Sequence, residues 1–303
     1  MEKLSLCSPA KVNLGLKVIA KRSDGYHEIQ TVFQMVDLCD DLTFEKTPVG
    51  IEVISDRTAL PADQDNLVYR AARLLASRTR TDWGAGITLT KRIPLAAGLG
   101  GGSSNAASTL LGLNHLWKLG MSRRGLMELA QELGSDVPFF LFAPRAYGSG
   151  RGEKLETLPL GQKTTVILLT PSLPISTAWA YANLKPYLGN DQGEIDRLQH
   201  LIEIGQEEEI GPHLYNTFEF LLSSLHPLIP QLKRELLRWG AYGALMSGSG
   251  PTVFGLFRSR SKAEAVYQVM KNQGLKSDKP GWDAFLAETV TDLKGVYGVD
   301  PLL

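Results

Sequence analysis

Alternating apolar and polar positions open the chain, and this period of two is typical of β-strands with one buried face. A polar turn at Lys21–Gly25 separates the first two alternating segments. The pattern predicts strands over Val12–Ile19, Ile29–Val36, Asp41–Glu45, Gly50–Ile54 and Gly86–Thr90. We therefore expect a β-sheet built from the opening part of the chain.

Apolar residues at helical spacing predict three helices in the same half of the chain. Leu67, Ala71 and Leu75 form the apolar face of the first of them. The predicted helices are Asn66–Ser77, a segment from Ser103 to a stop at Gly120, and Arg123–Leu133 between the caps Ser122 and Gly134. The first half therefore combines a sheet with packed helices.

The second half repeats this mixture after the glycine-rich stretch Arg145–Lys154, which predicts a loop or a domain boundary. Strands are predicted at Thr164–Thr170, Ala244–Met246 and Thr252–Phe257, and helices at Ser176–Tyr187, Asn216–Leu225, Ile229–Trp239 and Lys262–Lys271. The acidic run Glu207–Glu209 reads as a solvated face, and Trp117 and Trp239 as core residues. We expect two domains, 1–155 and 156–303.

Length and composition agree with two globular domains in a chain of 303 residues. Acidic and basic side chains balance at 32 each, so no overall field favours nucleic acid or an anionic membrane. The two cysteines, Cys7 and Cys39, fit a reducing compartment, and no Cys/His cluster has zinc-ligand spacing. Without a signal-like start or a long apolar segment, the sequence predicts a cytoplasmic protein with no membrane partner.

The strongest local signal is a cluster of glycines at Gly98, Gly100, Gly101 and Gly102, immediately before a predicted helix. Glycine lets backbone amides approach a ligand closely, and a helix N-terminus offers unpaired N–H groups to phosphate. The segment is not a Walker loop, because no lysine follows the glycines. The dinucleotide fingerprint also fails, because it needs a glycine at Ser103 and a later acidic residue. A plain strand-to-helix turn is the alternative.

The remaining pattern, Pro94-x-x-x-Gly98-Leu-Gly-x-x-Ser103-Ser104, resembles the ATP loop of the GHMP kinase superfamily. Pro9-Ala-Lys-Val-Asn13-Leu-Gly-Leu resembles the first motif of that family, and Ser247-Gly-Ser-Gly-Pro251-Thr-Val-Phe resembles its third. The resemblance covers residues 4–272 and leaves the tail after Gly274 without a role. It implies an ATP-dependent kinase for a small alcohol, with an N-terminal ribosomal-protein-S5-like α/β sandwich, a C-terminal ferredoxin-like domain, and the active-site cleft between them.

Three further segments resemble one branch of this superfamily, whose substrate is a methylerythritol carrying a cytidine diphosphate group in the non-mevalonate isoprenoid pathway. They are Asp24-Gly25-Tyr26-His27-Glu28, Gly134-Ser-Asp136-Val-Pro138-Phe139-Phe140 and Asn216-Thr-Phe-Glu219. Kinases of other alcohols such as mevalonate or homoserine, a related decarboxylase, and a non-catalytic ATP sensor stay open as alternatives. A nucleic-acid-binding module is disfavoured by the balanced charge.

The resemblance assigns catalysis to Lys11 and Asp136. Asp136 would take the proton from the 2-hydroxyl of the substrate, and Lys11 would keep that carboxylate ionised and offset developing negative charge. An N-cap for the segment at Val137 is the other interpretation of Asp136. A lysine on an edge strand is the other interpretation of Lys11.

The remaining site residues are also implied by the resemblance. Those expected at the substrate are Asn13, Tyr26, His27, Thr177, Tyr181 and Gly248, with Tyr26 and Tyr181 stacking on the base and His27 bonding its edge. Those expected at ATP are Pro94, Leu95, Ala96, Ala97, Gly98, Leu99, Gly100, Gly101, Gly102, Ser103 and Ser104. Mg²⁺ would enter with ATP, with Ser104 as its candidate ligand. The plain alternatives are packing or a surface position for Tyr26 and His27, a helix cap for Thr177 and a β-turn for Gly248.

Overall fold

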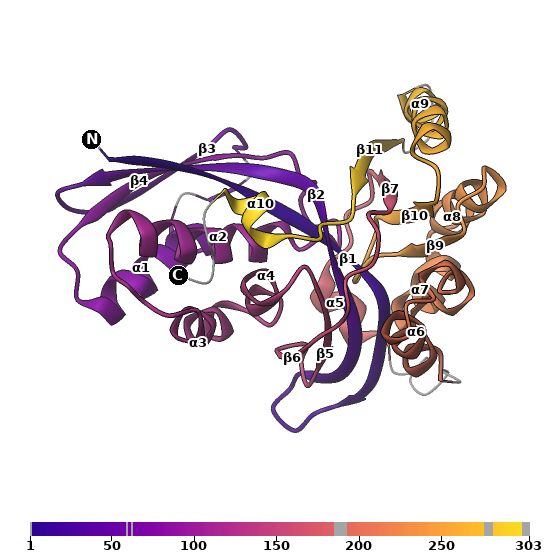
Figure 1. Cartoon of the computed structure of the whole chain (residues 1–303), viewed down its shortest axis with the longest axis horizontal. Helices are drawn as coiled ribbons and strands as arrows, with labels where there is room; N and C mark the ends of the chain where they lie inside the picture. The colour runs from indigo at the N-terminus through magenta and orange to yellow at the C-terminus, as the bar shows by residue number, and fades with distance from the viewer. Residues whose placement is uncertain (1, 59, 62, 185–192, 276–280, 299–303) are drawn as a thin grey trace.

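A long antiparallel pair, β1 (Lys3–Lys21) and β2 (His27–Thr47), runs through the molecule in the computed structural model (Figure 1). The structure describes residues 2–58, 60–61, 63–184, 193–275 and 281–298. The pair anchors a seven-stranded sheet in the order β3-β4-β2-β1-β8, with β5 on β2 and β6 on β5. The other strands are β3 (Ile51–Ser55), β4 (Gly84–Thr90), β5 (Arg145–Ser149), β6 (Lys154–Thr157) and β8 (Tyr215–Asn216).

Four helices cover one face of this sheet: α1 (Leu67–Thr79), α2 (Gly101–Leu116), α3 (Arg123–Leu133) and α4 (Val137–Phe142) (Figure 1). Asn66 caps α1 by accepting the N–H of Val68, and Ser122 caps α3 by accepting that of Gly125. Phe44 from the sheet, Leu110 from α2 and Phe140 from α4 share one buried core. The predicted α/β layer is confirmed, including Trp117 as a core residue.

A second sheet is antiparallel, in the order β11-β7-β10-β9. Its strands are β7 (Thr165–Pro171), β9 (Gly243–Met246), β10 (Val253–Phe257) and β11 (Trp282–Glu288). The helices of this half are α5 (Thr177–Ala182), α6 (Glu194–Glu203), α7 (Thr217–Leu225), α8 (Leu228–Arg238) and α9 (Arg260–Leu275), with short 3₁₀ turns η2 (Glu207–Glu209) and η3 (Gly211–His213). A third apolar cluster, including Val12 of β1, Leu168 of β7 and Phe254 of β10, joins the two halves.

Several expectations about the elements need correction. The predicted strands Ile29–Val36 and Asp41–Glu45 are one strand, because β2 keeps its pairing with β1 past a register shift at Pro9/Ala10. Arg145–Lys154 is not simply a loop, since its two ends enter β5 and β6, and β5 pairs with β2. Helix α5 ends at Ala182, so the predicted helix Ser176–Tyr187 is too long, because Asn183 and Leu184 are not helical. Residues 185–187 lie outside the described part of the chain.

Other corrections concern exposure and the end of the chain. Trp239 is 39% exposed and not a core residue. Glu207 is not a solvated charge, because it forms an ion pair with the buried Arg145. Helix α6 was not predicted. The tail also has a structural role, because after β11 it forms α10 (Leu293–Tyr297), which packs on the core of the first sheet (Figure 1).

Candidate active site

A cavity of about 1010 Å³ lies between the two halves of the molecule. Its walls come from β1, from the β1–β2 hairpin, from the segment before α2, from the start of α4, and from α5 and the turn after β9. Among the described residues, every site residue predicted from the sequence lines this cavity except Ser104. The fold therefore brings together groups that lie far apart along the chain.

Lys11 and Asp136 meet in this cavity, with Lys11 Nζ 3.6 Å from Asp136 Oδ2. The Lys11 side chain is 4% exposed, and that of Asp136 is 34% exposed. Lys11 is not an edge-strand lysine, because β1 is paired with β2 and the amide of Lys11 donates to the carbonyl of Leu99. The pair thus presents an accessible carboxylate beside a buried cation.

Three oxygens hold the ammonium of Lys11 in place. Besides the carboxylate, it donates to Asn13 Oδ1 at 2.6 Å and to the carbonyl of Gly98 at 3.0 Å. Asn13 lies on the same face of β1, and its amide nitrogen donates to Thr31 Oγ1 at 2.8 Å. Burial lowers the pKa of Lys11, and the neighbouring carboxylate opposes that effect by favouring the charged form. Lys11 is therefore oriented before any ligand enters.

Asp136 occupies the N-cap position of α4, yet its side chain accepts no capping hydrogen bond from the helix. The capping interpretation of this residue is therefore not supported. Helix α4 itself is fixed by its apolar residues, since Val137, Phe139 and Phe140 are fully buried. This anchoring lets the carboxylate of Asp136 face the cavity from a rigid position.

The glycine-rich segment bends sharply before α2. Gly98 and Gly100 have φ of +76° and +70°, a region that favours glycine, and Gly100 is the N-cap of α2. A Cβ on Gly98 would lie 2.1 Å from the carbonyl oxygen of Ser247, so no side chain fits there. The backbone and the N-terminus of α2 together line the cavity, as phosphate binding requires.

The turn between β9 and β10 braces this loop from the other half of the molecule. Ser247 Oγ donates to the carbonyl of Gly98 at 2.9 Å, and the amide of Thr252 donates to that of Ala97 at 3.4 Å. Asn216 holds the turn by donating to the carbonyls of Met246 and Gly248 at 2.6 and 2.8 Å. The motif that begins at Ser247 therefore supports the glycine-rich loop that contains Ala97 and Gly98.

Ser104 does not lie where its predicted role requires. Its side chain is fully buried, and its Oγ is 2.7 Å from Ser8 Oγ, away from the cavity. Ser103, one residue earlier on α2, lines the cavity instead. The rotation of about 100° per helical residue separates the two hydroxyls, which sequence proximity alone could not resolve.

Three aromatic residues gather in another part of the cavity wall. Tyr26 and His27 come from the β1–β2 hairpin and Tyr181 from α5, and the rings of His27 and Tyr181 are 4.9 Å apart. Phe218 supports Tyr181 in an edge-to-face contact at 4.8 Å. Burial, and then the charge of Lys21, lower the pKa of His27, which favours a neutral imidazole. The group suits a flat polar ring.

Three cations of the cavity wall were not predicted as site residues, namely Lys21, Lys91 and Arg151. Lys21 is close enough to His27 to affect its pKa, and the guanidinium of Arg151 is 4.6 Å from the centre of the Tyr26 ring. Arg151 follows a glycine in the turn between β5 and β6, where sequence alone indicates only a surface residue. Thr177 opens α5, and its Oγ1 is 2.8 Å from Ser249 Oγ, which links α5 to the turn after β9.

Comparison with known families agrees with this geometry. The sequence matches the description "GHMP kinases N terminal domain" over residues 66–143 and "GHMP kinases C terminal" over residues 193–276. The chain therefore belongs to the GHMP kinase family, which uses ATP as co-substrate.

Relatives that match over nearly the whole chain narrow this class. A protein of Acetivibrio thermocellus named 4-diphosphocytidyl-2-C-methyl-D-erythritol kinase is 38% identical, over 96% of this chain and 100% of the relative. A protein of Bacillus cytotoxicus with the same name is 42% identical, over 89% and 93%. The chain falls in the branch of the GHMP kinases that these names designate.

Solved structures give the same result. A crystal structure of 4-(cytidine 5'-diphospho)-2C-methyl-D-erythritol kinase superposes with a TM-score of 0.79 at 33% identity, covering 95% of this chain and all of the other. A homoserine kinase from Cytophaga hutchinsonii reaches 0.77 at 22% identity, over 97% and 96%, and shares the fold. The predicted two-domain GHMP kinase fold is confirmed. No helix in the described ranges is long and apolar enough to cross a membrane.

Proposed function

We propose that this protein transfers the γ-phosphoryl group of ATP to the 2-hydroxyl of 4-diphosphocytidyl-2-C-methyl-D-erythritol. The products are ADP and the 2-phosphate ester, an intermediate of non-mevalonate isoprenoid synthesis. One observation carries the proposal above the others. The Lys11–Asp136 pair shares one cavity with the glycine-rich loop before α2 and a cluster of aromatic rings.

The proposed transfer uses this pair in two ways. A carboxylate oxygen of Asp136 accepts the proton of the 2-hydroxyl as the oxygen attacks the γ-phosphorus, and the bond from that phosphorus to the β–γ bridging oxygen breaks. The proton ends on Asp136, and the electron pair of the broken bond leaves with ADP. The ammonium of Lys11, 3.6 Å from the carboxylate, offsets negative charge on the attacking oxygen.

Nucleotide binding is assigned to the segment Pro94–Ser103 and the N-terminus of α2. Mg²⁺ is proposed as the partner of ATP, and it would neutralise phosphate charge. Among the described residues no group of three or more His, Cys, Asp and Glu side chains could hold a metal ion. Mg²⁺ needs few protein ligands when phosphates bind it. Ser103 and Asp136 line the cavity with suitable oxygens, whereas Ser104 does not.

The cytidine end of the substrate is assigned to the aromatic group. Tyr26 and Tyr181 offer ring faces for stacking, and neutral His27 offers one acceptor and one donor to the edge of cytosine. Asn13, Thr177 and Gly248 also line the cavity, and we assign them to the polyol and diphosphate of the substrate.

Two broader assignments accompany this function. We propose a domain division near residue 155, supported by the change from the first sheet to the second between β6 and β7. Two later segments cross this division, since β8 pairs with β1 in the first sheet, and Leu293 and Tyr297 pack on the first core. A cytoplasmic location stays a proposal, supported by the free thiols of Cys7 and Cys39.

The test is ADP formation by purified protein with Mg²⁺-ATP and 4-diphosphocytidyl-2-C-methyl-D-erythritol, beside mevalonate and homoserine as competing alcohols. We expect turnover with the cytidine substrate alone. Turnover with a cytidine-free alcohol would move the assignment to another GHMP kinase. Nucleotide binding without turnover on any of these alcohols would favour the ATP-sensor alternative.

A further inference from the structure

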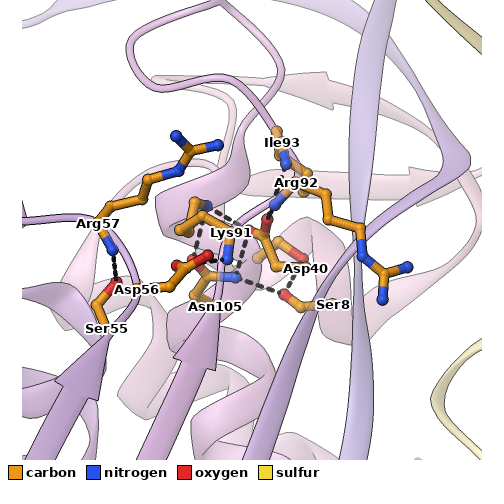
Figure 2. A network of polar contacts seen from close by, with 10 residues as sticks. Ser8, Asp40, Ser55, Asp56, Arg57, Lys91, Arg92, Ile93 and Asn105 are labelled. Carbon is orange, nitrogen blue, oxygen red and sulfur yellow. Dashed lines mark hydrogen bonds and ion pairs between the residues drawn. The ribbon is translucent and has the colours of Figure 1, made fainter.

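A buried ion pair lies directly behind the glycine-rich segment. The carboxylate of Asp40 on β2 contacts the ammonium of Lys91, the residue that follows β4. Their side chains are 0% and 3% exposed, respectively. Figure 2 shows this pair at the centre of a polar network that includes Ser8 and Asn105. None of the four residues Asp40, Lys91, Ser8 and Asn105 belongs to the glycine-rich motif Pro94–Ser104, from which the ATP loop was predicted.

The carboxylate of Asp40 holds both ends of that loop. Its Oδ1 accepts hydrogen bonds from the amides of Arg92 and Ile93, each at 2.8 Å, where the loop begins. Its Oδ2 accepts a bond of 2.9 Å from the side-chain amide of Asn105, near the start of α2, where the loop ends. One buried side chain therefore fixes the span of the loop (Figure 2).

The network continues to the strand that carries Lys11. Asn105 Nδ2 also donates to Ser8 Oγ at 3.0 Å, and Ser8 Oγ is 2.7 Å from Ser104 Oγ. Ser8 and Lys11 are both on β1. The loop, the start of α2 and the catalytic strand thus share one set of hydrogen bonds, which explains why Ser104 faces away from the cavity.

The ammonium of Lys91 also lies beside the N-terminus of α2. Lys91 lines the cavity, and its Nζ would lie 3.2 Å from a Cβ placed on Gly101, the first residue of α2. A cation at a helix N-terminus opposes the helix dipole, so this placement is unfavourable unless a negative charge compensates it. Asp40 supplies one negative charge, and an anion held at the loop would benefit from the same cation.

Stability gives little reason to keep such a pair, because well-packed apolar replacements of buried ion pairs are often as stable. We propose that Asp40 and Lys91 are positioning residues for the nucleotide phosphates, fixing both ends of the loop and the N-terminus of α2 in the binding geometry. The proposal rests on the proposed kinase function, since it takes Mg²⁺-ATP as the ligand of the loop. To the residues proposed for the nucleotide site it adds Asp40 and Lys91, which act on the phosphates by positioning the loop.

The experiment measures binding of Mg²⁺-ATP and, separately, of the cytidine substrate by isothermal titration calorimetry. The variants are Lys91→Met, Asp40→Asn, and the two together. Lys91→Met leaves Asp40 with three donors, namely two backbone amides and Asn105. Asp40→Asn leaves a buried ammonium without its carboxylate and is the variant most apt to misfold. The double variant removes both charges and tests the idea with a neutral interior.

A matched control is the ion pair between Arg145 on β5 and Glu207 of η2, whose side chains are 4% and 16% exposed. Glu207 does not line the cavity. We expect Glu207→Gln to lower the melting temperature while the Kd for ATP stays within about twofold. All folded variants of Asp40 and Lys91 should raise that Kd at least about tenfold, with the Kd for the cytidine substrate changed less than about threefold.

Two results would overturn the proposal. One is a wild-type Kd for ATP in both Lys91→Met and the double variant. The other is an equal loss for both ligands that parallels the loss in melting temperature, as a merely structural pair would give. The measurement also separates this idea from the function itself, because failure of the wild-type protein to bind ATP would reject the kinase proposal first.

Discussion

Replacing Lys11 by methionine and Asp136 by asparagine, singly and together, measures the coupling on which the proposed transfer depends. Lys11→Met removes a preorganised cation, which in comparable sites lowers kcat by about 10²–10³. Asp136→Asn removes the general base, with an expected loss of about 10²–10⁴. Because the two groups act on one proton and one oxygen, the fold-decrease in kcat of the double variant should be smaller than the product of the fold-decreases of the two single variants.

The size of this coupling between the two substitutions follows from the distance between the two charges. Two unit charges 3.6 Å apart attract by about 4–5 kcal/mol at an effective dielectric constant of about 20. Asp136 is about one-third exposed, so solvent screening reduces the net coupling to about 1–3 kcal/mol. In rates this is about 5–150-fold. The assay is coupled ADP release at saturating ATP and cytidine substrate, with the melting temperature of each variant as the folding control.

The matched control is the exposed pair of Lys3 and Glu45, which also joins β1 to β2. Lys3→Met and Glu45→Gln should leave kcat unchanged and show no coupling in it. Losses for Lys11 and Asp136 that multiply without coupling would refute the idea that the pair acts as a unit. Wild-type kcat in Asp136→Asn would remove this carboxylate from the mechanism altogether.

Three further predictions test the other parts of the cavity. Burial and the charge of Lys21 lower the pKa of His27 below its usual 6.5, so its imidazole is neutral at pH 7. Because protonation on acidification removes a hydrogen-bond acceptor, KM for the cytidine substrate should rise as the pH falls below 6.5. A KM that does not change with pH would contradict this prediction. Tyr181→Ala should raise that KM by about 5–150-fold, because stacking on a base contributes about 1–3 kcal/mol, whereas Tyr181→Phe should match the wild type in steady-state kinetics. Gly98→Ala should lower both the melting temperature and ATP affinity, because its Cβ would lie 2.1 Å from the carbonyl oxygen of Ser247; Gly102→Ala, whose nearest neighbour is 3.6 Å away, should keep the melting temperature.

The parts of the site predicted from local sequence are those that depend on backbone geometry. Gly98 and Gly100 indicated a phosphate loop because their conformational freedom is a local property, and both have positive φ. Lys11 and Asp136 were assigned only by resemblance, because they are far apart in the chain and nothing local to either residue specifies the other. The structure brings their side chains to 3.6 Å.

Long-range contacts explain what the sequence could not supply. Asp40 and Lys91 are separated by 51 positions, and each alone reads as a surface charge beside a strand. Glu207 looked solvated because its partner Arg145 comes from another element. By contrast, helix α6 was readable in principle, since its buried apolar residues recur at helical spacing; they are Ile195, Leu198, Leu201 and Ile202.

The return of the chain end to the first core has a consequence for synthesis on the ribosome. Tyr297 is 1% exposed in the core beside α4, and its hydroxyl donates to the carbonyl of Phe140 at 2.8 Å. Domains usually fold in order as they emerge, the N-terminal one first. Here the first core lacks α10 until the residues up to Tyr297 have left the ribosome, so the helix that Asp136 precedes acquires its full support only after the whole second sheet has been synthesised.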